Sequence, residues 1–147
     1  MWRAPGNQRI CRRASPLVPN PSAPRAYARC IPATRGGNVR ESGAFLLGPP
    51  GHPRSVSAVV FYDQIDPHAF DTGIIVIDGA CMADLWAICR RSSLAVVADV
   101  HTHPGGAGQS ESDRRHPMIA ERGHIAMIIP DFAAEPVKLN AIGLYRY

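Results

Sequence analysis

One apolar stretch that ends in two histidines constrains how this chain can fold. Residues 94–100 (LAVVADV) are apolar almost throughout, which is typical of a strand in the middle of a sheet. His101 and His103 follow it at positions i and i+2. Because alternate residues of a strand point to the same face, both imidazoles can converge on one ion. The pattern therefore predicts a central strand that carries a transition-metal site at its carboxyl end.

A third candidate ligand follows ten residues after the second histidine. Asp113 can fold back onto the site because glycines at 105, 106 and 108 permit a tight path for the intervening loop. Two histidines and one carboxylate leave the fourth position open, which is the pattern of a catalytic zinc site rather than a structural one. Two alternatives stay open: Asp113 could be a helix cap, and Glu111 is a competing carboxylate.

Two further residues could complete a hydrolytic centre. The Ser110 hydroxyl, beside a metal-activated water, could donate a hydrogen bond to a developing oxyanion. Such a water also needs a general base, and Glu41 is the best candidate because it heads a strand that could lie beside the central one. Considered alone, a glutamate in such a position is more commonly a charged residue at a strand start than a catalytic one. Asp99, two residues before His101, is either an indirect partner of the site or solvated.

The order of the expected elements predicts an α/β or α+β sandwich with a mixed β-sheet flanked by helices. Apolar spacing predicts a helix from Asp78 or Gly79 to Arg91. A shorter helix, capped by Ser112 and Asp113, is expected to run to about residue 120. Six strands are expected, the first two as a hairpin, at residues 41–48, 55–63, 73–77, 94–100, 124–129 and 141–147.

The basic charge belongs to the leading segment. Residues 1–40 hold eight arginines, no acid and many prolines, so residues 1–39 are interpreted as a disordered or spurious N-terminal extension, with organelle targeting as an alternative. Residues 41–147 hold the other eight basic residues against all twelve acidic ones, a net charge of −4. This balance argues against a nucleic-acid partner. No apolar run reaches the roughly 18 residues of a membrane span.

The four cysteines show no metal-binding spacing. Cys81 and Cys89 stand on the predicted helix, about 12 Å apart at 1.5 Å per residue, too far for a disulfide between them. We therefore expect reduced cysteines and a cytoplasmic protein.

The motifs resemble those of a known family. His101-Thr102-His103-Pro104 followed by Ser110-x-x-Asp113 looks like the H-[ST]-H-P and S-x-x-D signature of the JAMM (MPN-plus, JAB-type) zinc metalloproteases. Residues 41–48 (ESGAFLLG) are similar to the family's E-x-x-G-x-L-x-G strand, whose glutamate is the general acid/base. The resemblance covers residues 40–147, the expected catalytic domain. One departure is the loop before Ser110, where six residues, 104–109, stand in place of the usual seven.

The resemblance implies an MPN/JAB fold, a sandwich like that of cytidine deaminases, and a metallopeptidase reaction. His101, His103 and Asp113 would hold Zn²⁺, Glu41 would assist the attack of a metal-bound water, and Ser110 would steady the oxyanion. The implied substrate is an isopeptide or peptide bond after the C-terminal glycine of a ubiquitin-like protein, as for prokaryotic deubiquitinase-like isopeptidases.

Three other functions remain possible from the residues. A peptidase of the same fold could act on a sulfur-carrier protein or a small peptide. A catalytically silent MPN-type scaffold is a second alternative, although such members usually lack the metal ligands. A structural metal site is a third, and it would need a fourth protein ligand such as His116 or His124.

Overall fold

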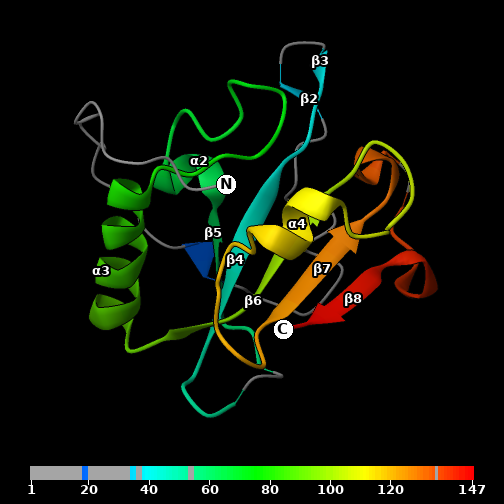
Figure 1. The fold of residues 1–147 in the computed structure, drawn as a ribbon. Coiled ribbons are helices and arrows are strands. Elements are labelled where there is room, and N and C mark those ends of the chain that lie inside the picture. The colour runs from blue at the N-terminus through cyan, green and yellow to red at the C-terminus, as the bar shows by residue number, and fades with distance from the viewer. Residues whose placement is uncertain (1–17, 20–33, 36–37, 53–54, 135) are drawn as a thin grey trace.

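The computed structural model describes residues 18–19, 34–35, 38–52, 55–134 and 136–147 (Figure 1). Most of the expected N-terminal extension, residues 1–39, lies outside the described residues. Of that segment the structure gives three short strands, β1 (Val18–Pro19), β2 (Thr34–Arg35) and β3 (Asn38–Val39). β2 and β3 form a separate two-stranded sheet, whereas β1 pairs with a strand of the main sheet.

The main sheet has six strands in the order β1-β5-β4-β6-β7-β8. β6 (Ala95–Thr102) is central, with β4 (Gly43–Gly48) antiparallel on one side and β7 (Ile125–Ile129) parallel on the other. β5 (Ala58–Phe61) forms the expected hairpin with β4, and β8 (Gly143–Arg146) pairs antiparallel with β7. The mixed sheet and the central position of the histidine-bearing strand are confirmed.

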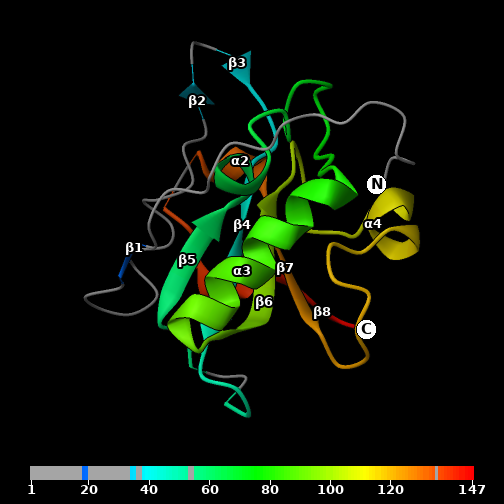
Figure 2. The same cartoon turned by 90° about the vertical axis from the view of Figure 1, so that its left-hand side faces the viewer.

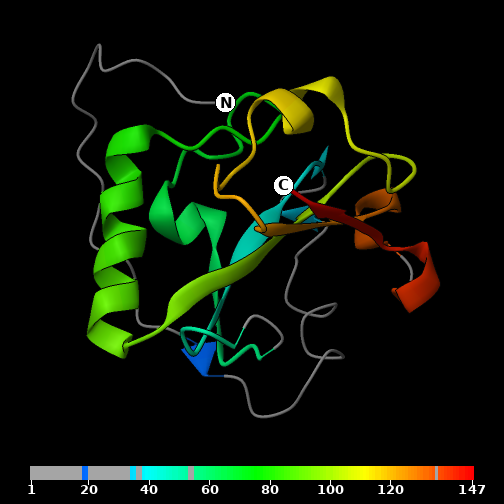
Figure 3. The same ribbon diagram turned by 60° about the horizontal axis from the view of Figure 1, so that its bottom comes forward.

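One face of the sheet is covered by α3 (Met82–Ser92) (Figures 2 and 3). The 3-10 turn η1 (Gly79–Cys81) precedes it, and together they span the helix expected from Asp78 or Gly79 to Arg91. The short α2 (Tyr62–Ile65) continues directly from β5. The largest core cluster lies between these helices and the sheet, where Phe45, Tyr62 and Leu85 are fully buried. The opposite face of the sheet carries a second cluster that includes Leu46 and Val100. β4 thus buries alternate residues in two different cores, because successive side chains of a strand point to opposite faces.

The expected strand at residues 73–77 is wrong. The segment has no ladder partner among the described residues, and the Val76 amide instead donates to the Ala69 carbonyl in a local loop. Ile75 and Ile77 are buried in the core, whereas Ile74 is half exposed. The alternation that suggested a strand therefore comes from a loop that inserts alternate side chains into the core.

The second expected helix is shorter than predicted and starts earlier. α4 spans Glu111–Arg115, and its N-cap is Ser110 rather than Ser112 or Asp113. It ends before Pro117, because a proline disfavours helical backbone at the preceding residue. The C-terminal third of the chain also contains the 3-10 turns η2 (Asp131–Ala133) and η3 (Leu139–Ala141).

The two cysteines on the expected helix differ from each other in the structure. Cys89 is a free, buried thiol, as expected, but Cys81 is disulfide-bonded, so the expectation of a reduced thiol there is wrong. In the part of the chain that the structure describes, every helix is too short or too polar to cross a membrane.

Candidate metal centre

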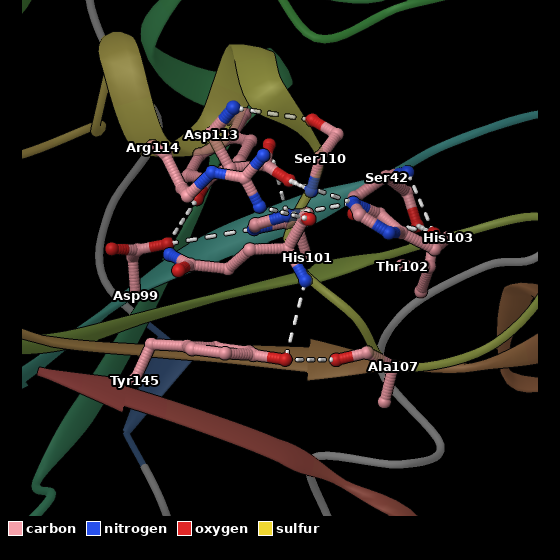
Figure 4. A network of polar contacts seen from close by, with 12 residues as sticks. Ser42, Asp99, His101, Thr102, His103, Ala107, Ser110, Asp113, Arg114 and Tyr145 are labelled. Atoms are coloured by element: carbon pink, nitrogen blue, oxygen red, sulfur yellow. Dashed lines mark hydrogen bonds and ion pairs between the residues drawn. The ribbon is translucent and has the colours of Figure 1, made fainter.

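Three side chains from two parts of the chain converge beyond the end of β6 (Figure 4). The Nε2 atoms of His101 and His103 lie 3.1 Å apart. Asp113, on α4, places Oδ1 3.6 Å from His101 Nε2 and Oδ2 3.3 Å from His103 Nε2. Both histidines are buried and Asp113 is partly buried. The structure therefore brings together the two histidines and the carboxylate that the motif singled out.

The spacing of these donor atoms fits a small divalent cation. At zinc–ligand distances near 2.05 Å, the donors of a tetrahedral site lie about 3.3 Å from one another. The two histidine nitrogens are 3.1 Å apart, and each lies 3.3–3.6 Å from one of the two Asp113 oxygens, His103 from Oδ2 and His101 from Oδ1. With one ligand atom taken from each residue, all three lie within 4.8 Å of one another, so a small shift would bring them to that spacing. Imidazole nitrogens with one carboxylate are also a donor set that suits zinc and similar transition metals.

Asp113 is the third helical residue of a capping box whose N-cap is Ser110, and it also belongs to the site. The Ser110 amide donates to Asp113 Oδ2 at 2.7 Å, and the Asp113 amide donates to Ser110 Oγ at 3.1 Å. This reciprocal pair is a capping box, which satisfies two backbone amides at the start of α4. Because Ser110 Oγ acts there as an acceptor, its proton is left to donate elsewhere. The two interpretations of Asp113, cap and ligand, therefore do not exclude each other.

Sheet register places Glu41 beside the histidines. Gly43 pairs with His101, and continuing that register by two residues sets Glu41 opposite His103. The intervening pair is tied by the Thr102 amide, which donates to the Ser42 carbonyl at 2.9 Å, and by the Ser42 amide, which donates to Thr102 Oγ1 at 3.0 Å. Thr102 is fully buried, and its side chain points away from the face that carries the histidines.

Glu41 is half-buried on the wall of the same cavity. Burial raises the pKa of the Glu41 carboxyl above its ordinary value, and Asp113 adds to that effect. The neighbouring His103 and His101 act in the opposite direction, as does a hydrogen bond from the Ile75 backbone. A carboxyl group with a raised pKa is better suited to take and return a proton near neutral pH.

A buried polar network supports the histidine side of the centre. Asp99 is 1% exposed and accepts hydrogen bonds from the Tyr62 hydroxyl at 3.1 Å and from His124 at 2.7 Å. Its Oδ2 also lies 3.7 Å from His101 Nδ1, a buried atom that has no hydrogen-bond partner among the described residues. Of the two roles that the sequence left open for Asp99, the solvated one is wrong. The carboxylate lies behind the histidine, where such groups orient metal-binding imidazoles.

The charge of Asp99 is maintained by its neighbours. Burial acts to raise the pKa of its carboxyl, but the His101 and His124 imidazoles outweigh that effect and hold the pKa below its ordinary value. Gly43 makes room for the network, because a Cβ there would lie 2.4 Å from the Tyr62 ring. From the sequence, His124 was named only as a possible metal ligand. Nothing local in the sequence links Tyr62 to the Asp99 network.

The other candidate ligands lie outside the cluster. His124 is engaged with Asp99, and Glu111 forms an exposed ion pair with Arg115 at 2.5 Å. His116 is exposed at the wall of the cavity. Within the described residues, the cluster therefore consists of three side chains, which leaves one side open to a small molecule.

The centre opens into a cavity of about 300 Å³. Its wall combines the polar residues above, Glu41 and Ser110 included, with an apolar side. The apolar part is formed by Ile74, Ile75, Pro117, Met118, Ala126 and part of Tyr147. The segment that was expected to be a strand is thus a wall of the cavity.

Comparisons with known proteins find matches of low sequence identity, among them a distant curated relative and a solved structure. No family model matches the chain. The chain is 28% identical to a protein of Sinorhizobium fredii named "Probable metalloprotease y4jG", over 47% of each chain, so it spans about half the length of that relative. The solution structure of protein DSY2949 from Desulfitobacterium hafniense has a TM-score of 0.48 at 19% identity, with 82% of each chain covered. The chain therefore combines a convergent His/His/Asp cluster with a partial sequence likeness to a protein named as a metalloprotease.

Proposed function

We propose that this chain is a zinc-dependent hydrolase that cleaves a peptide or isopeptide bond. The observation that carries the proposal is the shared cavity: a half-buried carboxyl, Glu41, lies beside two histidines and Asp113 whose donor atoms have the spacing of a metal site. The distant relative named as a probable metalloprotease supports the same reaction class.

His101 Nε2, His103 Nε2 and one Asp113 oxygen would hold the zinc ion. Bound there, zinc would supply Lewis acidity, which polarises a carbonyl and acidifies water. Glu41 accepts the proton of the attacking water and later returns it to the leaving amine. Ser110 donates a hydrogen bond from its hydroxyl to the oxyanion of the tetrahedral intermediate, since its oxygen already accepts from the Asp113 amide.

The finer proposal is a JAMM-type isopeptidase, with residues 40–147 as the catalytic domain. Its support is the motif: the five residues to which the resemblance assigns a catalytic or metal-binding role line the same cavity, namely Glu41, His101, His103, Ser110 and Asp113. The substrate would be the C-terminal glycine linkage of a ubiquitin-like protein. A sulfur-carrier protein or a small peptide is the alternative substrate, and the cavity geometry serves either. A catalytically silent scaffold is disfavoured, because the chain retains the three candidate metal ligands and Glu41.

The test compares wild-type protein with Glu41→Gln. Purified protein is loaded with zinc, its metal content is measured, and hydrolysis is followed on three substrates: an isopeptide-linked ubiquitin-like protein, a linear fusion after Gly-Gly, and a short Gly-Gly peptide. We expect Glu41→Gln to keep one zinc and to lose hydrolysis of every substrate that the wild type cleaves. The matched control, Glu121→Gln, changes an exposed acid outside the cavity and should behave as wild type.

Two outcomes would contradict the proposal. Normal cleavage by Glu41→Gln would show that Glu41 is not the base. Failure of the wild-type protein to bind zinc would contradict the proposal of a zinc-dependent hydrolase altogether. The three substrates separate the finer alternatives, because cleavage of the short peptide alone would favour a general peptidase.

A further inference from the structure

The segment that leads to Asp113 has no regular structure of its own. Residues 103–110 contain neither helix nor strand, and three of them are glycines. α4, which carries Asp113, has only five residues and no buried side chain. A metal ligand on such a segment needs support from elsewhere in the fold, because an unsupported loop samples many conformations.

The last strand supplies hydrogen bonds to this loop through Tyr145. Its hydroxyl donates to the Ala107 carbonyl at 2.7 Å and accepts from the Gln109 amide at 3.2 Å (Figure 4). Ala107 and Gln109 belong to the irregular part of the loop, so one hydroxyl satisfies a backbone acceptor and a backbone donor that no helix or strand engages.

Tyr147 makes a second such contact two residues further on. Its hydroxyl donates to the Asp113 carbonyl at 2.9 Å and accepts from Gln109 Nε2 at 2.7 Å. Because Tyr145 and Tyr147 are two positions apart in extended chain, both rings lie on one face of the sheet edge. Together they fix the loop at residues 107, 109 and 113.

Gly143 gives independent evidence that this surface of β8 is shaped to hold the loop. A Cβ at this position would lie 2.1 Å from the Ala107 carbonyl oxygen, closer than any real contact. Only glycine therefore allows the loop backbone to lie against the strand here.

We propose that Tyr145 and Tyr147 are positioning residues that hold the loop so that Asp113 faces His101 and His103. The inference rests on the proposed metal site. Without the hydroxyls, the loop must be ordered when metal binds, and that ordering opposes binding. Loss of a residue that supports a metal ligand typically lowers metal affinity 10–100-fold.

The test uses Tyr145→Phe, Tyr147→Phe and the double variant in the full chain. Leu144→Ala is the matched control, since Leu144 lies on the same strand and is 68% exposed. Amide hydrogen exchange of the metal-free proteins reports loop order, and zinc titration against a chelator reports affinity. We expect faster exchange at Gln109 and its neighbours in the tyrosine variants, and zinc binding about tenfold weaker for each single variant. Leu144→Ala should match wild type in both measurements.

The two measurements keep the inference and the proposed function apart. Unchanged zinc affinity in the double variant would overturn the inference, even if its unfolding midpoint fell, because a merely structural role lowers stability without affecting metal binding. Unchanged exchange in the metal-free variants would overturn it as well. If the wild type bound no zinc, the proposed function would fail together with the role in metal binding, while exchange would still decide whether the tyrosines order the loop.

Discussion

The two halves of the candidate centre are built in different ways. His101 lies on β6, and His103 and Glu41 lie just beyond the paired ends of β6 and β4, where the register of these strands sets them opposite each other. Asp113 and Ser110 stand on a short helix that follows an irregular loop, and side-chain hydrogen bonds hold them. A sheet places residues by backbone pairing that many sequences share, whereas the loop depends on a few individual contacts. The loop half should therefore be the more easily altered without loss of the fold.

The largest expected effect comes from the loop half. Asp113→Ala removes one of three ligands, so stoichiometric zinc and hydrolysis should both be lost. The metal-free protein should lose only about 1 kcal/mol of unfolding free energy, as for a helix cap. Metal analysis and denaturant unfolding measure the two quantities. Glu111→Ala is the control, and retention of stoichiometric zinc by Asp113→Ala would place the third ligand elsewhere.

In the sheet half, Asp99→Asn should reduce both zinc affinity and stability. We expect zinc affinity to fall 10–100-fold because the carboxylate behind His101 is lost. The metal-free protein should lose about 3 kcal/mol, since His124 and Tyr62 lose a buried charged partner. An unfolding free energy equal to that of wild type would show that the network does not support the sheet half.

The same carboxyl predicts a pH dependence of stability. Because its pKa is lower in the folded state, the contribution of Asp99 is fully present above its ordinary value of 3.8 and is lost as the pH falls below it. The free energy of unfolding, measured from pH 6 down to pH 3, should thus decline less steeply in metal-free Asp99→Asn than in metal-free wild type. Parallel declines would contradict the lowered pKa.

A smaller effect is expected from Thr102→Val, which keeps the shape but removes the hydroxyl that accepts from the Ser42 amide. Because Ser42 precedes Gly43 and follows Glu41, this contact fixes where the acid lies. We expect kcat to fall about tenfold and stability by about 1–2 kcal/mol, with zinc affinity unchanged. Weakened zinc binding, with kcat preserved at saturating metal, would show that Thr102 supports the histidines instead.

The sequence predicted the sheet half better than the loop half. An apolar run that ends in His-x-His has only one plausible placement in a sheet, and β4 with Glu41 was expected beside it. The register that sets Glu41 opposite His103 was not predictable, since it depends on pairing across sixty residues. The Asp99 network joins residues 25 and 37 positions apart, and Tyr147 contacts Asp113 across 34. Local patterns carry no signal for such contacts. The segment at 73–77 misled because apolar alternation arises in a packed loop as well as in a strand.

The most direct test of the central claim is a crystal structure of zinc-loaded protein, with the ion located by its anomalous scattering. The account predicts one zinc about 2.0–2.2 Å from His101 Nε2, His103 Nε2 and an Asp113 oxygen, with Glu41 facing it but not bound. A zinc held by His116 or His124 as a fourth protein ligand, by Glu41 directly, or at another place in the chain would contradict the account.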